Sequence, residues 1–441
     1  MNQLTERLYS MASSGKIGLL GAVAIGIGGM VGGGIFAVLG LSVKLSGGGA
    51  PLSFAIAGLV ALLTAYSYAK LSVAIPSQGG TVAFLDKAFQ PGIFIGGLNI
   101  LLLFSYIVML SLYSYAFGSY GSTFGPESFQ PILKHILISF SIVAMVALNM
   151  FSSDIVSKAE TAIVGLKVLI LIVFIAFGIF GINSEQIAVG TWSPPLNLIA
   201  GGMIIFLAYE GFELIANTAA DIKNPNKNLP RAYFSAVIFV IVLYILIALV
   251  TVGNLALPQI IASKDYALAE AAKPFLGSKG FILIACAALL STGSAINATM
   301  YGTTRLSYII AKDGELPEVL EKKVWNQPIE GLIISSILAL LIANFFDLSS
   351  ISTMGSAGFL IIFAAVNGAN MKLYKTTNSN RYISLFGFIA CLGALVILLW
   401  QTAVTSPSRL LVLIVMAGLA FLVEWLYRVI SGRKLQISEP K

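Results

Sequence analysis

Among the ionisable side chains in long apolar runs of this 441-residue sequence, Lys167, Glu210 and Glu213 could do chemistry. Lys167 lies in AIVGLKVLIL (162–171), and Glu210 and Glu213 flank a glycine in IIFLAYEGFE (204–213). A charge at the centre of a bilayer costs about 2.5–3.5 kcal/mol on insertion scales. Such residues therefore face a protein interior or water. The chemistry open to them is the binding of an ion or a charged solute and the transfer of a proton.

A glycine-rich run offers backbone groups for the same purpose. GIGGMVGGGIF (26–36) lies in an apolar stretch from 17 to 45 that is long enough to cross a bilayer. The consecutive glycines Gly32, Gly33 and Gly34 each weaken a helix by roughly 1 kcal/mol relative to Ala. Because they have no side chains, a ligand can reach the backbone there. We expect the helix to break there and to direct free amides at a small anion. The alternative is a close-packing face built on glycines four residues apart.

The elements that must position these groups are membrane helices. Of all residues, 58% are hydrophobic and 10% are charged, and the mean hydropathy is +0.93. These values exclude a soluble domain of this size and predict an all-α polytopic membrane protein. Apolar segments of spanning length cover 17–45, 50–72, 91–120, 132–151, 159–182, 196–219, 232–253, 277–310, 331–346, 350–371, 382–402 and 409–430.

A glycine interrupts the sixth segment, between Glu210 and Glu213, as the glycine run interrupts the first. Segments one and six are five apart. Transporters built from inverted five-helix repeats bind their substrate between two broken helices in matching positions of the repeats. The sequence therefore predicts a binding site between these two spans.

Basic residues predict the orientation. Most of the 26 Lys and Arg residues fall in the terminal tails and in the even-numbered loops. The odd-numbered loops hold only Lys44, Lys134, Lys264, Lys273, Lys279 and Arg409. By the positive-inside rule, both termini are cytoplasmic in a multi-pass protein of the plasma membrane, with short tails at 1–16 and 431–441.

Several motifs resemble those of the amino acid–polyamine–organocation superfamily. GGGIF (32–36) resembles its first-span motif. FLAYEGFE (206–213), followed by DIKNP (221–225) and LPRA (229–232), resembles its sixth-span signature and the loop after it. SAINATMYG and AKDGELP, within 294–317, match its eighth span and the following loop. The likeness covers nearly the whole chain.

The resemblance implies a fold of twelve transmembrane helices. Ten of them would form a LeuT-like five-plus-five inverted repeat with discontinuous helices 1 and 6. The two repeats would span 17–182 and 194–371, and two further helices would follow at 382–430.

For the substrate, the resemblance implies a site made of backbone groups. The amides of Gly33 and Gly34 would hold the carboxylate of an amino acid, and carbonyls near Met30 and Leu207 would meet its ammonium. A zwitterion held in this way leaves its side chain to be sorted by the shape of the pocket. The predicted substrate-binding residues are Met30, Gly32, Gly33, Gly34, Phe206, Leu207, Tyr209 and Glu210.

The resemblance also implies a coupling role for Lys167. In an archaeal proton-coupled member, a fifth-span lysine occupies the place of the sodium ion of sodium-coupled relatives, and the matching neighbours here are Gly28 and Ser291. A buried lysine releases its proton more readily than an exposed one, so it can respond to physiological pH. The alternative is that Lys167 snorkels toward the cytoplasmic interface.

The sixth span holds further candidates. Glu213 is predicted to stabilise the interrupted helix or to take part in proton movement. Glu210 stands where relatives carry an apolar residue, and it either favours cationic substrates or stays protonated. Phe206, Tyr209 and Phe212 are candidates for an aromatic gate, or simply core residues.

Other classes of function are poorly supported. The one His and the two Cys residues form no metal-binding pattern, and the sequence has no nucleophile motif and no ATP-binding lysine loop. We therefore predict no enzyme, no cofactor and no metal, and a proton-coupled, sodium-independent amino acid symporter with alternating access. Its partners are an amino acid, protons and the lipid bilayer, not nucleic acid, and its oligomeric state is open. The alternatives are an amino acid exchanger of the same family and a channel-like pore. The connections at 264–273 and 311–330 are predicted to be solvated surface.

Overall fold

The computed structural model describes residues 16–77, 79–90, 92–151, 154–317, 320 and 329–431, and most of the two predicted tails lies outside them. Every element longer than an isolated bridge within this part of the chain is a helix. The helices are α2 (Leu19–Met30), α3 (Gly34–Ser46), α4 (Ala50–Ala74), α5 (Thr81–Ala88), α6 (Ile93–Ser122), η1 (Glu127–Phe129), α7 (Gln130–Phe151), α8 (Asp154–Gly178), η2 (Ile179–Gly181), α9 (Ser184–Ile187), η3 (Val189–Thr191), α10 (Pro195–Ile204), η4 (Phe206–Tyr209), α11 (Leu214–Asn217), η5 (Ala219–Asp221), α12 (Pro225–Asn254), α13 (Leu257–Ala262), α14 (Ala267–Lys312), α15 (Ile329–Phe345), α16 (Leu348–Lys372), α17 (Arg381–Thr405) and α18 (Pro407–Ser431).

Most of these helices are long and apolar enough to cross a membrane. In the described ranges nine helices qualify singly, and the number rises to eleven if each of two bent pairs is counted as one span. The bent pairs are α2 with α3, and α10 with the helical turns up to Asn217. The shorter apolar helix α15 stands at the ninth predicted segment. The prediction of an all-helical polytopic membrane protein is confirmed.

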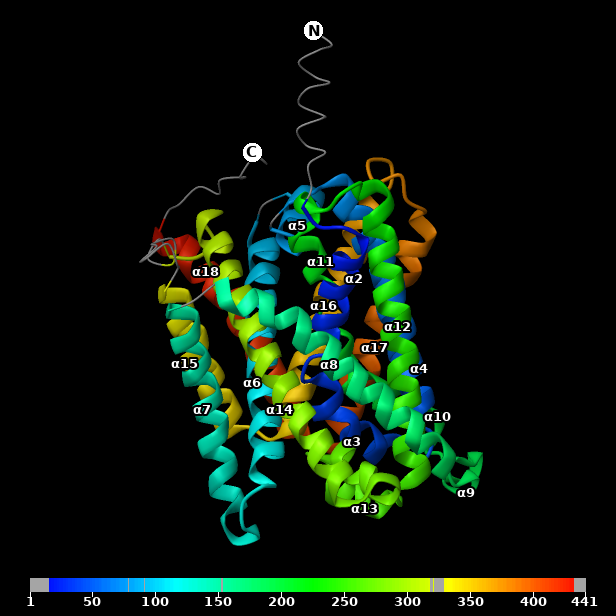
Figure 1. Ribbon diagram of the computed structural model, residues 1–441. Helices are drawn as coiled ribbons and strands as arrows, with labels where there is room; N and C mark the ends of the chain where they lie inside the picture. The colour runs from blue at the N-terminus through cyan, green and yellow to red at the C-terminus, as the bar shows by residue number, and fades with distance from the viewer. Residues whose placement is uncertain are drawn as a thin grey trace.

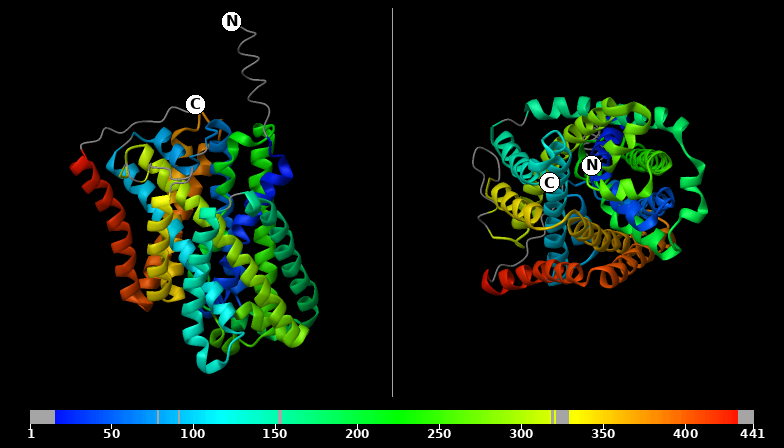
Figure 2. Two further views of the ribbon diagram at one scale, coloured as in Figure 1. Left: turned by 60° about the vertical axis from the view of Figure 1, so that its left-hand side comes forward. Right: turned by 90° about the horizontal axis from the view of Figure 1, so that it is seen from below.

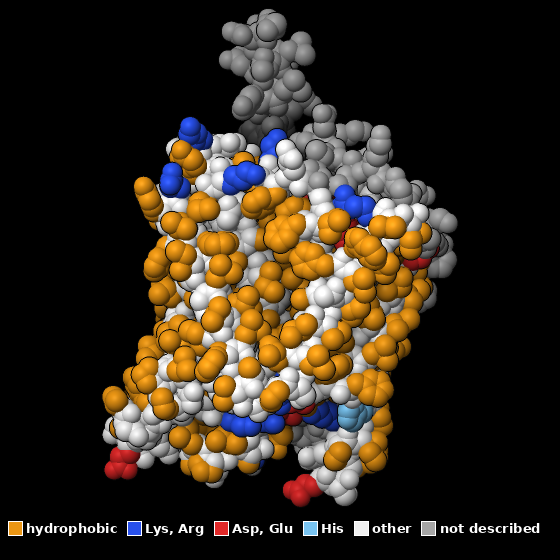
Figure 3. All heavy atoms as spheres, turned by 180° about the vertical axis from the view of Figure 1, so that it is seen from behind, with side chains coloured by type: hydrophobic (Ala, Val, Ile, Leu, Met, Phe, Trp, Pro, Cys, Tyr) orange, Lys and Arg blue, Asp and Glu red, His pale blue; other side chains and the backbone are white. Residues whose placement is uncertain are grey.

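The helices form a bundle with the first span near its middle (Figures 1 and 2). The apolar windows of α6 and α16 are 83% and 89% buried, whereas those of α7 and α18 are only 17% buried. The first pair therefore forms the core, and the second pair lies at the periphery. Figure 3 shows the apolar side chains that cover the outside of the bundle, with charged side chains gathered toward its two ends.

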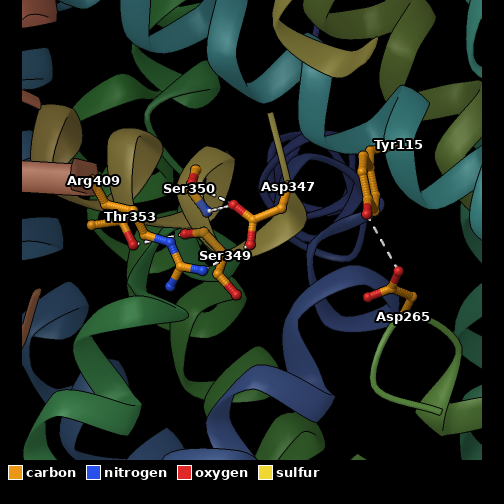
Figure 4. A network of polar contacts seen from close by, with 7 residues as sticks. All are labelled: Tyr115, Asp265, Asp347, Ser349, Ser350, Thr353 and Arg409. Carbon is orange, nitrogen blue, oxygen red and sulfur yellow. Dashed lines mark hydrogen bonds and ion pairs between the residues drawn. The ribbon is translucent and has the colours of Figure 1, made fainter. Parts of the chain in front are cut away.

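Prolines and caps mark where helices begin. Pro lies in the first turn of α4, α10, α12 and α13, where a missing N–H costs no helical bond. Asp347 caps α16 by accepting the N–H of Ser350 at 3.2 Å, and it pairs with Arg409 of α18 at 2.9 Å (Figure 4). These contacts join the ends of two helices that are far apart in sequence.

Where the structure describes them, the two connections predicted to be solvated surface are partly buried, so that prediction was wrong there; residues 318, 319 and 321–328 of the second connection lie outside the described residues. Leu268 and Ala271, at the start of α14, are fully buried, and Gly40 of α3 faces the backbone of Lys264. In the second connection Glu315 is only 2% exposed, and it accepts a hydrogen bond from Asn99 of α6 at 2.9 Å. A charged or Ala-rich segment is exposed to solvent only when no other element covers it.

Candidate functional site

The first span breaks at the glycine run. Helix α2 ends at Met30, α3 begins at Gly34, and the two half-helices are bent by 49°. The N–H groups in the first turn of α3 have no acceptor within their own helix, and the last carbonyls of α2 have no donor within theirs. The interruption therefore presents donors on one side and acceptors on the other in the middle of the bundle.

The sixth span breaks between α10 and α11. Helix α10 ends at Ile204, a short 3₁₀ turn follows, and the two parts of the span are bent by 52°. Gly211 has φ +121°, a conformation that strains any residue with a side chain. The predicted interruption at this glycine is therefore a feature of the backbone itself.

The two interruptions touch each other. A Cβ added to Gly29 would lie 2.6 Å from the carbonyl oxygen of Gly211, and one added to Gly34 would lie 2.8 Å from the Cα of Ala208. Real Cβ atoms do not approach backbone so closely, so only glycine permits these contacts. Gly29 and Gly34 thus have a packing role as well, although they are five residues apart and not the pair with four-residue spacing, Gly28 and Gly32, of the alternative interpretation.

Side chains from neighbouring helices cover the carbonyl end of α2. Lys167 of α8, with 1% of its surface exposed, donates from Nζ to the carbonyl of Gly28 at 3.1 Å. Ser291 of α14 donates to the carbonyls of Gly32 at 2.7 Å and Val31 at 3.2 Å. The structure thus brings Lys167, Gly28 and Ser291 to one site, and the amine of Lys167 lies inside the bundle instead of reaching the surface.

Tyr244 was missed in the sequence, although it touches both interruptions. Its hydroxyl, on α12, donates to the carbonyl of Met30 at 2.6 Å and lies 3.3 Å from that of Ala208. The carbonyl of Leu207, by contrast, already accepts the N–H of Glu210 at 3.1 Å. In an apolar run of Val, Ile and Leu, one tyrosine gives no signal that it faces inward.

The interruption in the sixth span is held by one of its own residues, Glu213, and by side chains of α6 and α16. Glu213, 1% exposed, accepts the N–H of Gly211 at 2.7 Å on one oxygen and the hydroxyl of Tyr106 at 3.0 Å on the other. Ser356 of α16 donates to the carbonyl of Ile204 at 3.1 Å and accepts the N–H of Leu207 at 3.1 Å. Both oxygens of the Glu213 carboxyl therefore have a donor.

Glu210 lies beside this pair, and 4% of its surface is exposed. It faces the carboxyl of Glu213 and the hydroxyl of Tyr113 on α6. The ring of Tyr113 also packs where a side chain of Gly33 would lie, next to Thr292. Tyr113 therefore connects the acidic residue to the amide end of the first-span interruption, which the sequence did not indicate.

The three aromatic gate candidates are all fully buried. Tyr209 donates to the carbonyl of Phe54 on α4 at 2.8 Å. Phe206 and Phe212 both stack near Phe363 of α16, with ring centroids 5.8 and 5.3 Å apart. In this conformation the three rings are core contacts that tie the interrupted sixth span to α4 and α16.

The candidate site thus consists of two bent spans, which contact each other at glycine backbone, and the buried amine of Lys167. Residues 17–422 match the family model of amino acid permeases. The chain belongs to the amino acid permease family. The resemblance found in the motifs is thereby confirmed, and the protein is a membrane transport protein and not an enzyme.

This permease is similar in sequence to several other proteins. It is 38% identical over 89% of its length to the uncharacterized protein MJ0609 of Methanocaldococcus jannaschii, of which 90% is covered. It is 33% identical over 86% of its length to the inner membrane transport protein YbaT of Escherichia coli, of which 89% is covered. The branched-chain amino acid permease BcaP of Lactococcus lactis is 28% identical over 78% of both chains.

Proposed function

We propose that this permease imports amino acids across the plasma membrane by proton symport, without sodium, through alternating access. The observation that carries the proposal is the amine of Lys167 on the carbonyl of Gly28, with the Ser291 hydroxyl on the carbonyl of Gly32 in the same interruption. An amine in that place supplies the positive charge that a bound metal cation would otherwise bring to the end of α2. The family and the relatives named above support amino acids as the class of substrate.

The substrate would bind at the two interruptions through backbone groups. Its carboxylate would meet the amides of Gly33 and Gly34 at the positive end of the α3 dipole. Its ammonium would meet the carbonyl of Met30 and a carbonyl of the sixth span. Ala208 joins the predicted Leu207 as a candidate there, because its carbonyl lies 3.3 Å from the same Tyr244 hydroxyl that contacts the Met30 carbonyl. The hydroxyl of Tyr244 then stands between the two carbonyls.

Protonation of Lys167 would bias the arrangement of three helices. The charged amine holds the end of α2 against α8 through a charge-assisted hydrogen bond, which is stronger than a neutral one. Loss of the proton weakens that bond and favours release of α2. A proton that enters from one side and leaves on the other thus selects between two arrangements of the bundle.

The topology belongs to the same proposal. Two repeats at 17–182 and 194–371 would place the two bent spans in matching positions, and 382–430 would add the last two helices. Helix α2 begins and α18 ends at the upper end of Figure 1, which would be the cytoplasmic side.

Uptake into proteoliposomes tests the proposal. The purified permease is reconstituted without sodium and without internal amino acid, a pH gradient is imposed, and a panel of radiolabelled amino acids is offered. We expect uptake above equilibrium that stops when an ionophore collapses the gradient. An absolute need for sodium would refute the coupling. A need for internal amino acid would instead show an exchanger, and unsaturable flux would show a channel.

A further inference from the structure

A short helical segment covers the outer half of the first span. Residues 257–276, here called the lid, comprise α13, the turn after it and the start of α14 up to the break at Gly277, where φ is +63°. A Cβ added to Gly40 of α3 would lie 2.5 Å from the Cα of Lys264 in the lid. Backbone therefore lies directly against backbone, and α3 is buried along its length except at Lys44 and Leu45.

One ion pair fastens the lid to the rest of the bundle at this end. Nζ of Lys134, at the start of α7, lies 3.0 Å from Asp265 in the lid. The same ammonium stands 3.7 Å from the ring centre of Tyr115 on α6, and the Tyr115 hydroxyl points at Asp265 from 3.4 Å (Figure 4). The contact thus joins the lid to two helices that follow one another in the bundle.

The surroundings make this pair stronger than an ordinary surface pair. The side chains of Lys134 and Asp265 are only 19% and 20% exposed, and the second oxygen of Asp265 is buried without a hydrogen-bond partner among the described residues. An anion in that position depends on its one cation, because water cannot replace it fully. The aromatic face of Tyr115 adds a cation–π contact and fixes the ammonium in place.

We infer that Lys134, Asp265 and Tyr115 form a latch that holds the lid closed over α3 on the outer side. An outer opening that exposes the two interruptions must lift the lid from Gly40, and the Lys134–Asp265 pair is an ion pair that has to break. Lys134 and Asp265 are positioning residues, since they lie away from the interruptions. The inference rests on the proposed function for the direction of transport, but not for the existence of the latch.

Labelling of a cysteine under the lid tests the latch without any transport. Ala37 is fully buried on α3, one turn from Gly40 on the same face, and Ala37→Cys is placed in a background with Cys286→Ala and Cys391→Ser. The rate of reaction with a membrane-impermeant thiol reagent reports opening from outside. We expect Lys134→Met and Asp265→Asn each to raise that rate roughly fivefold or more.

The double variant and a matched pair complete the experiment. The combined Lys134→Met and Asp265→Asn variant should react no faster than the faster single variant, because both changes break one contact. Lys273→Met removes an ion pair of 2.8 Å to Glu270 within the lid itself and a cation–π contact to Phe281 later in α14, neither of them to α6 or α7, and should leave the rate unchanged. Single variants that react like the parent, or rates that multiply in the double variant, would overturn the latch. Failure of uptake alone would overturn only the proposed function.

Discussion

The two interrupted spans bend by nearly the same angle, 49° and 52°, but they are held in different ways. The carbonyl end of α2 is covered by Lys167, Tyr244 and Ser291, which come from three other helices. The sixth span is held mainly by Glu213 of its own chain segment and by serines of α16. A change in a neighbouring helix can therefore release either interruption, but the second keeps one contact, from Glu213 to the Gly211 N–H, that lies within its own segment.

The largest effect is expected where the two interruptions touch. Gly34→Ala would bring a Cβ to 2.8 Å from the backbone of Ala208, which cannot rotate away. The two spans must then separate, and we expect substrate affinity and uptake to fall more than about tenfold. Gly302→Ala, with nothing within 4 Å, is the matched control and should keep both. Equal behaviour of the two variants would show that close contact at Gly34 is not required.

Tyr244→Phe is a smaller change, which removes one contact between the two interruptions. The change removes the hydroxyl from the carbonyls of Met30 and Ala208 and leaves the ring in place. A buried carbonyl without its donor costs about 1–3 kcal/mol, so substrate affinity should change about tenfold while the protein stays folded. Binding measured by substrate-induced thermal stabilisation checks this, and an unchanged affinity would remove Tyr244 from the site.

Substitution of Glu213, which holds the interruption of the sixth span from within, should lower the stability of the protein. Glu213→Gln replaces a carboxylate that accepts from both the Gly211 N–H and the Tyr106 hydroxyl. Loss of a charge-assisted bond of this kind costs about 1.5–3 kcal/mol, which should lower the Tm by a few degrees. Glu210→Gln removes a carboxyl that faces Glu213, so its Tm should not fall. A Tm lowered equally by both substitutions would argue against a structural role specific to Glu213.

The smallest effect is a pH dependence of stability that does not involve either interruption. Burial, with Asp313 nearby, raises the pKa of Asp86 on α5 to about 7. Burial, with Asp86, Glu424 and Asp313 nearby and despite the Asn99 amide, raises the pKa of Glu315 to about 8. Both carboxyls bind protons more tightly in the folded protein than in the unfolded chain, where their pKa values are near 4.

The free energy of unfolding should therefore fall as the pH rises from about 4 to about 8. We expect the Tm of the wild type to drop by about 2 °C or more between pH 5.5 and 8.5. In the double variant Asp86→Asn and Glu315→Gln that slope should flatten. A slope that persists unchanged would assign the pH dependence elsewhere, Lys167 included. The double variant removes the titration of two carboxyls that lie away from both interruptions, so any pH dependence that remains can be compared between the two interruptions.

The sequence predicted much of this molecule because its signals were local. Each predicted apolar segment contains a helix. The first interruption lies at the predicted glycine run, and the second begins at Ile205 and extends past the predicted Gly211. Lys167 stood out because a lysine is rare among apolar residues. Tyr113 and Tyr244 did not stand out, because a tyrosine inside an apolar helix can face lipid, pack in the core or line a binding site. The buried lid and Glu315 were misjudged for the complementary reason, since their burial depends on helices far away in the sequence.

Uphill accumulation by Lys167→Ala tests the central claim most directly. The variant and the wild type are reconstituted in sodium-free proteoliposomes with the same pH gradient, together with Gly165→Ala, a substitution on the same helix with open space around it. We predict that wild type and Gly165→Ala accumulate substrate above equilibrium, and that Lys167→Ala does not. Retained uphill accumulation by Lys167→Ala would contradict a coupling role for this amine.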